Sequence, residues 1–196
     1  MGGKCRHCHK KISIEYPLFE ITSLALTLGV YLRFGISTFS VALFLSLSCL
    51  LVASALDIES MEVELGIFIA GIVFALIWYF GSNSLSLSSA ALLGWAILLA
   101  VFLPLVFYFV SHEKWMGLGD AIFALWAAIL VGFPLSGVAM FCAFVSGAIF
   151  GIIIIVTRKR DAKVGIPFGP FIALGAIIAL FWGNVILDAY LKIIGF

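Results

Sequence analysis

Residues 67–80 decide the fold: they read IFIAGIVFALIWYF and contain no charged side chain. A helix needs about 20 mostly apolar residues to cross a hydrocarbon core of about 30 Å, and this run with its flanks is long enough. The run does not alternate apolar with polar residues, as strands of a membrane β-barrel do over about ten positions. Because a helix satisfies its own backbone hydrogen bonds in lipid, the run predicts a membrane-spanning helix.

The whole chain has the composition of a membrane protein. Of its 196 residues, 64% are hydrophobic and 11% are charged, whereas a soluble domain has about 45–50% apolar and about 25% charged residues. This composition excludes an ordinary soluble enzyme and a disordered chain. The net charge of +1 excludes a basic nucleic-acid-binding domain. We therefore expect the lipid bilayer, and no nucleic acid, among its partners.

Seven apolar stretches predict an all-α, polytopic transmembrane bundle of about seven spans. They cover residues 16–34, 39–56, 65–80, 90–110, 120–133, 136–157 and 168–189. The third and fifth stretches are short and need semi-polar flanks to complete a crossing. The linkers are too short for a soluble domain. We therefore divide the chain into a cytoplasmic N-terminal segment, residues 1–15, and a transmembrane domain, residues 16–196, whose chemistry is argued below.

The distribution of lysine and arginine predicts the orientation of the chain. With seven spans, nine of the eleven basic residues fall on one side of the membrane. These nine are Lys4, Arg6, Lys10, Lys11, Lys114, Arg158, Lys159, Arg160 and Lys163. Arg33 and Lys192 fall on the other side. Because loops rich in lysine and arginine stay in the cytoplasm, we expect a multi-pass protein of the inner (plasma) membrane with a cytoplasmic N-terminus.

Cys5 and Cys8 form a Cys-x-x-Cys motif before the first span. A disulfide is not expected on the cytoplasmic side of a membrane. The motif is half of a tetrahedral zinc site, which needs four ligands, and no second pair follows it along the chain. We therefore expect an incomplete half-site at Cys5 and Cys8 rather than a bound zinc ion.

Asp57 and Asp120 are the acidic residues that we single out as candidate functional groups. Asp57 closes the second stretch in Ala53-Ser-Ala-Leu-Asp57, and Asp120 opens the fifth in Gly117-Leu-Gly119-Asp120. An ionisable residue at membrane depth is costly and by default marks a functional site. By the span count, both lie at cytoplasmic helix ends. They share one depth and can approach one another.

Two carboxylates a few ångströms apart share one proton, because they cannot both stay charged. The ionised partner can take a proton from water while the protonated partner polarises a carbonyl, as in aspartic proteases. Gly117 and Gly119 lack a Cβ and would let a substrate strand approach Asp120. Two other interpretations stay open on these residues alone. Asp120 is also suited to cap a helix, and the pair is also suited to an ion path in a transporter.

Five segments occur in the order and spacing of a known family. They are Gly3–Cys8, Ile12–Glu20, Ala55–Glu59, Met116–Asp120 and Ile166–Gly175. On these segments, which extend over nearly the whole chain, the sequence resembles the type IV prepilin peptidases. That family belongs to the GxGD class of membrane aspartic proteases.

The resemblance implies an aspartic endopeptidase that removes the basic leader from type IV prepilins and pseudopilins, and so serves type IV pilus assembly and protein secretion. The cut falls at the cytoplasmic membrane face, and the substrate presents an apolar helix. By the same resemblance, Asp57 and Asp120 are the catalytic pair. The positions that support the active site are Glu20, Gly117, Gly119, Pro167, Gly169 and Pro170. Pro167 and Pro170 are expected to break the last span near the cytoplasmic face.

The family usually begins with a further span and cysteine pair, whereas this chain begins at the second pair. We therefore expect no S-adenosylmethionine site in this chain, and no cofactor for proteolysis. The lack of that upstream segment, with departures from the family pattern at Glu15, Ile122 and Val63–Leu65, motivates a rival interpretation, a catalytically silent relative that binds pilin precursors or assembly proteins. An ion-coupled transporter is the other rival, but it should show polar groups at the midplane and paired broken helices.

Overall fold

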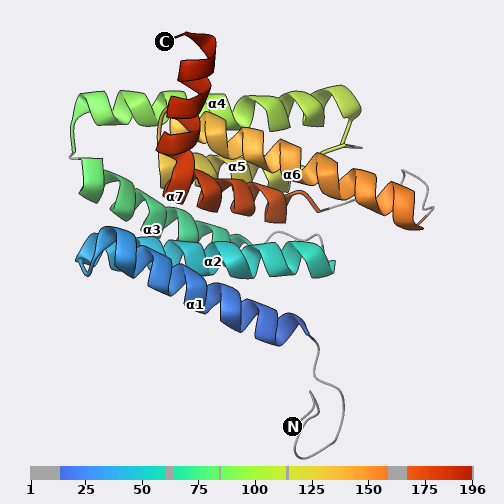
Figure 1. The fold of residues 1–196 in the computed structure, drawn as a ribbon, viewed down its shortest axis with the longest axis horizontal. Helices are drawn as coiled ribbons and strands as arrows, with labels where there is room; N and C mark the ends of the chain where they lie inside the picture. The colour runs from blue at the N-terminus through green and yellow to red at the C-terminus, as the bar shows by residue number, and fades with distance from the viewer. Residues whose placement is uncertain (1–13, 61–63, 84, 114, 159–166, 196) are drawn as a thin grey trace, which may run out of the picture.

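The computed structural model describes residues 14–60, 64–83, 85–113, 115–158 and 167–195, and all regular secondary structure in these residues is helical. The helices are α1 (Glu15–Phe34), α2 (Thr38–Ser60), α3 (Leu65–Asn83), α4 (Leu87–Ser111), α5 (Leu118–Val131), α6 (Leu135–Arg158) and α7 (Gly169–Ile194), as Figure 1 shows. Each helix overlaps one predicted stretch. The prediction of an all-α bundle is therefore confirmed.

Within the described residues, six helices are long and apolar enough to cross a membrane, and α5 is shorter. With 14 residues, α5 is about 21 Å long, which is less than a hydrocarbon core of about 30 Å. It corresponds to the predicted fifth span, residues 120–133. That stretch is helical as expected, but too short to cross a bilayer alone.

Two features of the predicted topology remain predictions. One is the cytoplasmic location of the N-terminus, and the other is the division of the chain after residue 15. Cys5 and Cys8, the predicted half-site, lie outside the described residues.

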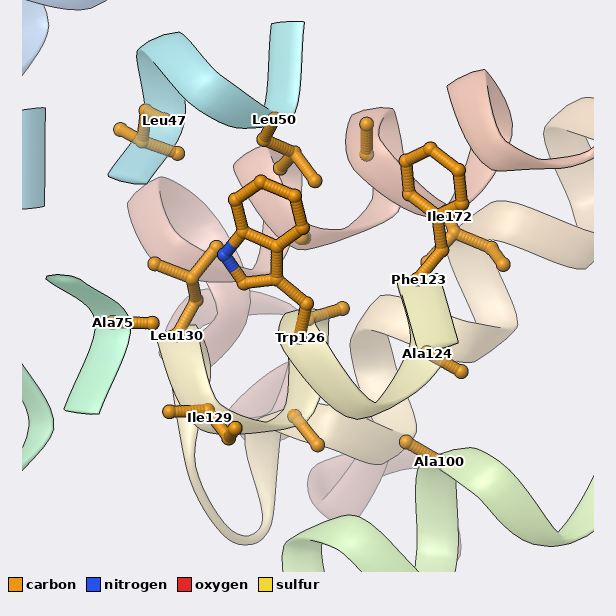
Figure 2. Close-up of a cluster of buried hydrophobic side chains, with 14 of the residues drawn as sticks. Leu47, Leu50, Ala75, Ala100, Phe123, Ala124, Trp126, Ile129, Leu130 and Ile172 are labelled. Carbon is orange, nitrogen blue, oxygen red and sulfur yellow. The ribbon is translucent and has the colours of Figure 1, made fainter. Parts of the chain in front are cut away.

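The short helix α5 lies at the centre of the bundle. It contacts α3, α4, α6 and α7, and most of its side chains are buried. Figure 2 shows the indole of Trp126 from α5 beside Leu47 and Leu50 of α2. Because α5 is enclosed by longer helices, its small and apolar residues pack against protein rather than lipid, and the position of its N-terminus is determined by those neighbours.

A chain of buried hydrogen bonds joins α5 to α2 and α3. Trp126 Nε1 donates to Ser46 Oγ at 2.9 Å, and Ser46 Oγ donates to the backbone oxygen of Gly71 at 2.8 Å. Gly71 leaves the space that the indole fills, because a Cβ added there would overlap the ring of Trp126. These bonds fix the rotation of α5 about its axis, since the indole N–H finds its partner in one orientation.

We expect the substitution Ser46→Ala to destabilise this junction. It leaves the N–H of Trp126 buried without a partner, which costs about 1–3 kcal/mol in the free energy of unfolding. The matched control is Ser48→Ala. Within the described residues Ser48 bonds only to its own helix, at Phe44, so its loss should cost less than about 0.5 kcal/mol. Thermal unfolding of the purified variants in detergent measures both. Equal stability of the two variants contradicts the expectation.

The direction of the helices alternates, so one end of the bundle gathers the C-terminal ends of α2, α4 and α6 with the N-terminal ends of α5 and α7 (Figure 1). Asp57 lies in the last turn of α2 and Asp120 in the first turn of α5. We call this the carboxylate end. The buried residues of α7 stop at Gly183, and Figure 1 shows α7 bending so that its C-terminal part crosses α4 in this view and ends beyond it.

Candidate active site

Asp57 is half-buried, and its Oδ2 accepts a hydrogen bond from the backbone N–H of Gly169 at 3.0 Å. Gly169 is the first residue of α7, whose N-cap residue, Phe168, has no capping side chain. Asp57 therefore caps α7 from another helix. The positive end of the α7 dipole in turn stabilises the negative charge of Asp57.

Asp120 is the third residue of α5 and is also half-buried. Its Oδ2 accepts a hydrogen bond from the backbone N–H of Gly117 at 2.9 Å. Gly117 is the N-cap residue, in an extended conformation with φ −87° and ψ 166°. This bond is the acidic half of a capping box. Asp120 therefore caps α5 from its third position and is not the N-cap residue considered from the sequence, and it lies at the positive end of α5.

The carboxylate of Asp57 lies close enough to act electrostatically on that of Asp120. Gly169 lies against Asp57 and against Phe123, the residue one helical turn after Asp120. A Cβ added at Gly169 would lie 2.6 Å from Asp57 Oδ2 and 2.5 Å from Phe123 Cε2. Phe123 follows Asp120 by three residues, so these two side chains share one face of α5. The structure thus brings together two carboxylates that lie far apart along the sequence.

Each carboxylate keeps one oxygen available. Both use Oδ2 for the backbone bonds, and among the described residues neither Oδ1 makes a hydrogen bond. Two carboxylates that come within a few ångströms of each other share one proton. The ionised member can then take a proton from water while the protonated member donates to a carbonyl oxygen. The arrangement is therefore able to activate water for attack on a peptide bond.

The ring of Phe123 forms an apolar wall of this site. It is buried and packs edge-on against Phe68, with ring centroids 4.8 Å apart. Phe68 in turn packs against Trp126 at 5.6 Å. These rings exclude water from the inner side of the carboxylate end, where charges interact more strongly than in water.

Gly117 borders open space. A Cβ added there would meet no atom nearer than the backbone nitrogen of Gly119, at 3.9 Å. Gly117 is exposed and Gly119 half-buried. The chain therefore leaves room beside Gly117, and the roles of the two glycines in substrate access remain predictions.

Pro167 and Pro170 flank Gly169 at the start of α7. Pro170 is the second residue of the helix, where the missing N–H costs little because helix N-termini leave their first N–H groups unpaired. The prolines therefore lie where α7 begins, and they do not interrupt the helix farther along. Since Pro170 has no N–H, the N–H of Gly169 is the donor at this point that can bind Asp57.

The remaining predicted residues lie apart from the pair or outside the described residues. Glu20 is exposed on α1, and among the described residues its side chain makes no hydrogen bond or ion pair. The part of the chain that the structure describes holds no group of three or more His, Cys, Asp or Glu side chains able to bind a metal. A zinc half-site at Cys5 and Cys8 and the lack of an S-adenosylmethionine site therefore stay predictions.

Comparison with known proteins identifies the family. The model of the Type IV leader peptidase family matches residues 43–152, a range that includes both Asp57 and Asp120. The chain belongs to this family. A second family model, the bacterial Peptidase A24 N-terminal domain, matches residues 1–34 of the chain.

The relatives carry the name prepilin leader peptidase/N-methyltransferase. The one from Pseudomonas aeruginosa is 31% identical over 209 residues, which cover 100% of this chain and 68% of the relative. The one from Xanthomonas campestris is 31% identical over 202 residues, with the same coverage. The one from Legionella pneumophila is 28% identical, covering 97% of this chain and 67% of the relative. No solved structure matches the chain.

Membership of the type IV leader peptidase family makes the chain a peptidase and a multi-pass protein of the inner membrane. The family resemblance found in the sequence is therefore confirmed. The same comparison does not assign the catalytic residues or the face of the membrane at which the peptidase acts.

Phe123 was not predicted to lie beside the carboxylates, and Phe168 was part of the predicted motif segment Ile166–Gly175 without being singled out. Phe123 lies three residues after Asp120, a spacing that places both on one helix face, and this signal was available in the sequence. Phe168 lies directly before Gly169 in the predicted motif, but its role depends on packing between α6 and α7, which no sequence spacing indicates.

Proposed function

We propose that the chain is a membrane aspartic endopeptidase that removes the basic leader from type IV prepilins and pseudopilins, with Asp57 and Asp120 as its catalytic pair. One observation carries the proposal: in a member of the type IV leader peptidase family, two interacting carboxylates lie at one end of the bundle, each held by a backbone N–H at a helix N-terminus. The names of the relatives support the substrate class.

In the proposed reaction the carboxylate pair begins with one shared proton. The ionised carboxylate takes a proton from water as the water oxygen bonds to the scissile carbonyl carbon, and the protonated carboxyl gives its proton to the carbonyl oxygen. As the diol collapses, the ionised carboxylate takes a proton from one diol hydroxyl, the C–N bond breaks, and the leaving amine takes the proton of the protonated carboxyl. The products are a leader with a new carboxyl group and a mature chain with a new amine, and the pair again holds one proton.

The remaining positions have supporting roles in this proposal. Gly169 binds Asp57 through its N–H, Gly117 binds Asp120 in the same way, and Gly119 leaves space for the substrate backbone. The excess of lysine and arginine on one side of the spans supports a cut at the cytoplasmic face. The apolar helix of the precursor would lie in the bilayer beside the bundle, with its basic leader in the cytoplasm.

The test is cleavage by the purified 196-residue chain in lipid vesicles. The substrate is a type IV prepilin with its basic leader, and the control substrate is the same pilin without the leader. Mass spectrometry of the products should show one cut, between the leader and the apolar helix, and no change in the control. A folded, inserted chain that binds the precursor and releases no leader contradicts the proposal and favours the catalytically silent relative.

A further inference from the structure

Gly147 of α6 forms a notch that the ring of Phe168 fills. A Cβ added at Gly147 would lie 2.7 Å from Phe168 Cε2 and 3.6 Å from Phe171 Cγ. Carbon atoms in contact prefer separations of about 3.5–4.0 Å. The ring of Phe168 is therefore close enough to the α6 backbone that no side chain larger than hydrogen fits at residue 147 without a shift.

The ring of Phe168 is also held on other sides. Its centroid lies 5.1 Å from that of Phe144 on α6 and 6.0 Å from that of Phe171 on α7. Phe144 is itself packed against Phe107 of α4 at 5.9 Å. The ring of Phe168 is half-buried and packs against Phe144 and Phe171. We expect a displacement of this ring to be passed in part to its own backbone.

The backbone of Phe168 leads directly to the catalytic pair. Its neighbour Gly169 donates its N–H to Asp57 Oδ2 at 3.0 Å. The contacts thus form a continuous path from Gly147 through the ring of Phe168 to the hydrogen bond that holds Asp57. No side chain of α7 itself offers this carboxylate a hydrogen bond, so the N–H of Gly169 is the link between Asp57 and α7.

We propose that Gly147 and Phe168 are positioning residues, which set the place of the Gly169 N–H and through it the orientation of Asp57. This inference rests on the proposed function, because it assigns a role in the reaction to residues that act through the Gly169 N–H and not on the substrate. It adds α6 to the helices that determine the geometry of the site, which otherwise comes from α2, α5 and α7.

The expected effect follows from the size of the overlap. A methyl group at Gly147 moves the Phe168 ring back by about 1 Å, the difference between the 2.7 Å separation and a normal carbon contact. A displacement of about 1 Å in a catalytic group can lower the rate about 100-fold. We expect Gly147→Ala to lower kcat about 100-fold and to leave KM unchanged, since the open side of the site at Gly117 is not altered.

The experiment compares prepilin cleavage by Gly147→Ala, Phe168→Leu and the double variant in lipid vesicles. Leucine does not reach the notch, so Phe168→Leu should lower kcat less than Gly147→Ala. The double variant should return to the kcat of Phe168→Leu, because the overlap is gone and the two losses do not multiply. The matched control is Gly29→Ala, since Gly29 also faces a ring, Phe181 Cζ at 3.1 Å, away from Asp57; its kcat should match the wild type.

Each result decides between the interpretations. The positioning role is overturned by a wild-type kcat in Gly147→Ala, by losses that multiply in the double variant, or by an equal loss in Gly29→Ala.

If Gly147→Ala does not fold, Phe168→Leu alone still tests the positioning role, which predicts a lowered kcat with an unchanged KM and a retained unfolding temperature. Asp57→Asn is measured alongside. If it cleaves normally, the proposed function fails; if it is inactive while Gly147→Ala has wild-type kcat, the positioning role alone fails.

Discussion

Replacing either Asp57 or Asp120 by asparagine is expected to abolish prepilin cleavage, and replacing both is expected to do no further harm. Asparagine has nearly the same shape as aspartate but cannot exchange a proton with water or with a carbonyl oxygen. General acid–base catalysis contributes about 10²–10⁴-fold to a rate, so each single variant should lose at least that much. Because the members of one catalytic unit are not additive, the double variant should lose no more than either single variant.

The asparagine variants should still fold. The amide oxygen of asparagine can accept the N–H of Gly169 or of Gly117 that the carboxylate accepts in the native chain, so both helix caps are kept. Thermal unfolding in detergent checks this. Asp188→Asn is the control for a lost acidic side chain, because Asp188 is exposed on the part of α7 beyond the buried residues. Near-normal cleavage by either single variant rules out that Asp57 and Asp120 act together as one catalytic unit.

Gly169→Ala is expected to have the second largest effect on activity. The added Cβ would lie 2.6 Å from Asp57 Oδ2 and 2.5 and 2.8 Å from two carbons of the Phe123 ring. The ring is buried and cannot move away, so Asp57 must give way and its bond to the Gly169 N–H is disturbed. A displacement of about 1 Å at the chemistry lowers rates about 100-fold, and we expect at least that loss in kcat.

Gly66→Ala provides the matched control for this substitution. Gly66 is the second residue of α3, and a Cβ added there would meet nothing within 4 Å. Both substitutions raise the helix propensity of a first-turn position equally, so only the contact with Asp57 and Phe123 separates them. Initial rates of cleavage at saturating prepilin compare the two. Full activity in Gly169→Ala would contradict the expectation that catalysis by Asp57 depends on its close contact with Gly169.

Much of the architecture could be predicted from apolar runs alone. The seven stretches are helical because uncharged runs such as residues 67–80 have no other way to satisfy their backbone in lipid. The meeting of Asp57 and Asp120 at one end also followed, since helices that alternate in direction bring the end of the second and the start of the fifth together. The five motif segments indicated the family to which the chain belongs.

What could not be predicted depends on how helices pack in space. The second stretch was predicted to end at residue 56, but α2 continues to Ser60, because a helix that leaves the hydrocarbon no longer needs apolar residues. The bond between Gly169 and Asp57 joins a backbone N–H to a side chain of another helix, which no spacing reveals. The indole of Trp126 and the hydroxyl of Ser46 likewise meet only after α5 is enclosed by its neighbours.

The measurement that tests the central claim most directly is the intact mass of a prepilin after incubation with the wild-type chain and with Asp120→Asn, each folded and inserted in vesicles. The account predicts that the wild-type chain converts the precursor to a leader and a mature pilin. It also predicts that Asp120→Asn binds the precursor and leaves its mass unchanged. Conversion by both proteins, or by neither, contradicts the assignment of Asp57 and Asp120 as the catalytic pair of an active peptidase.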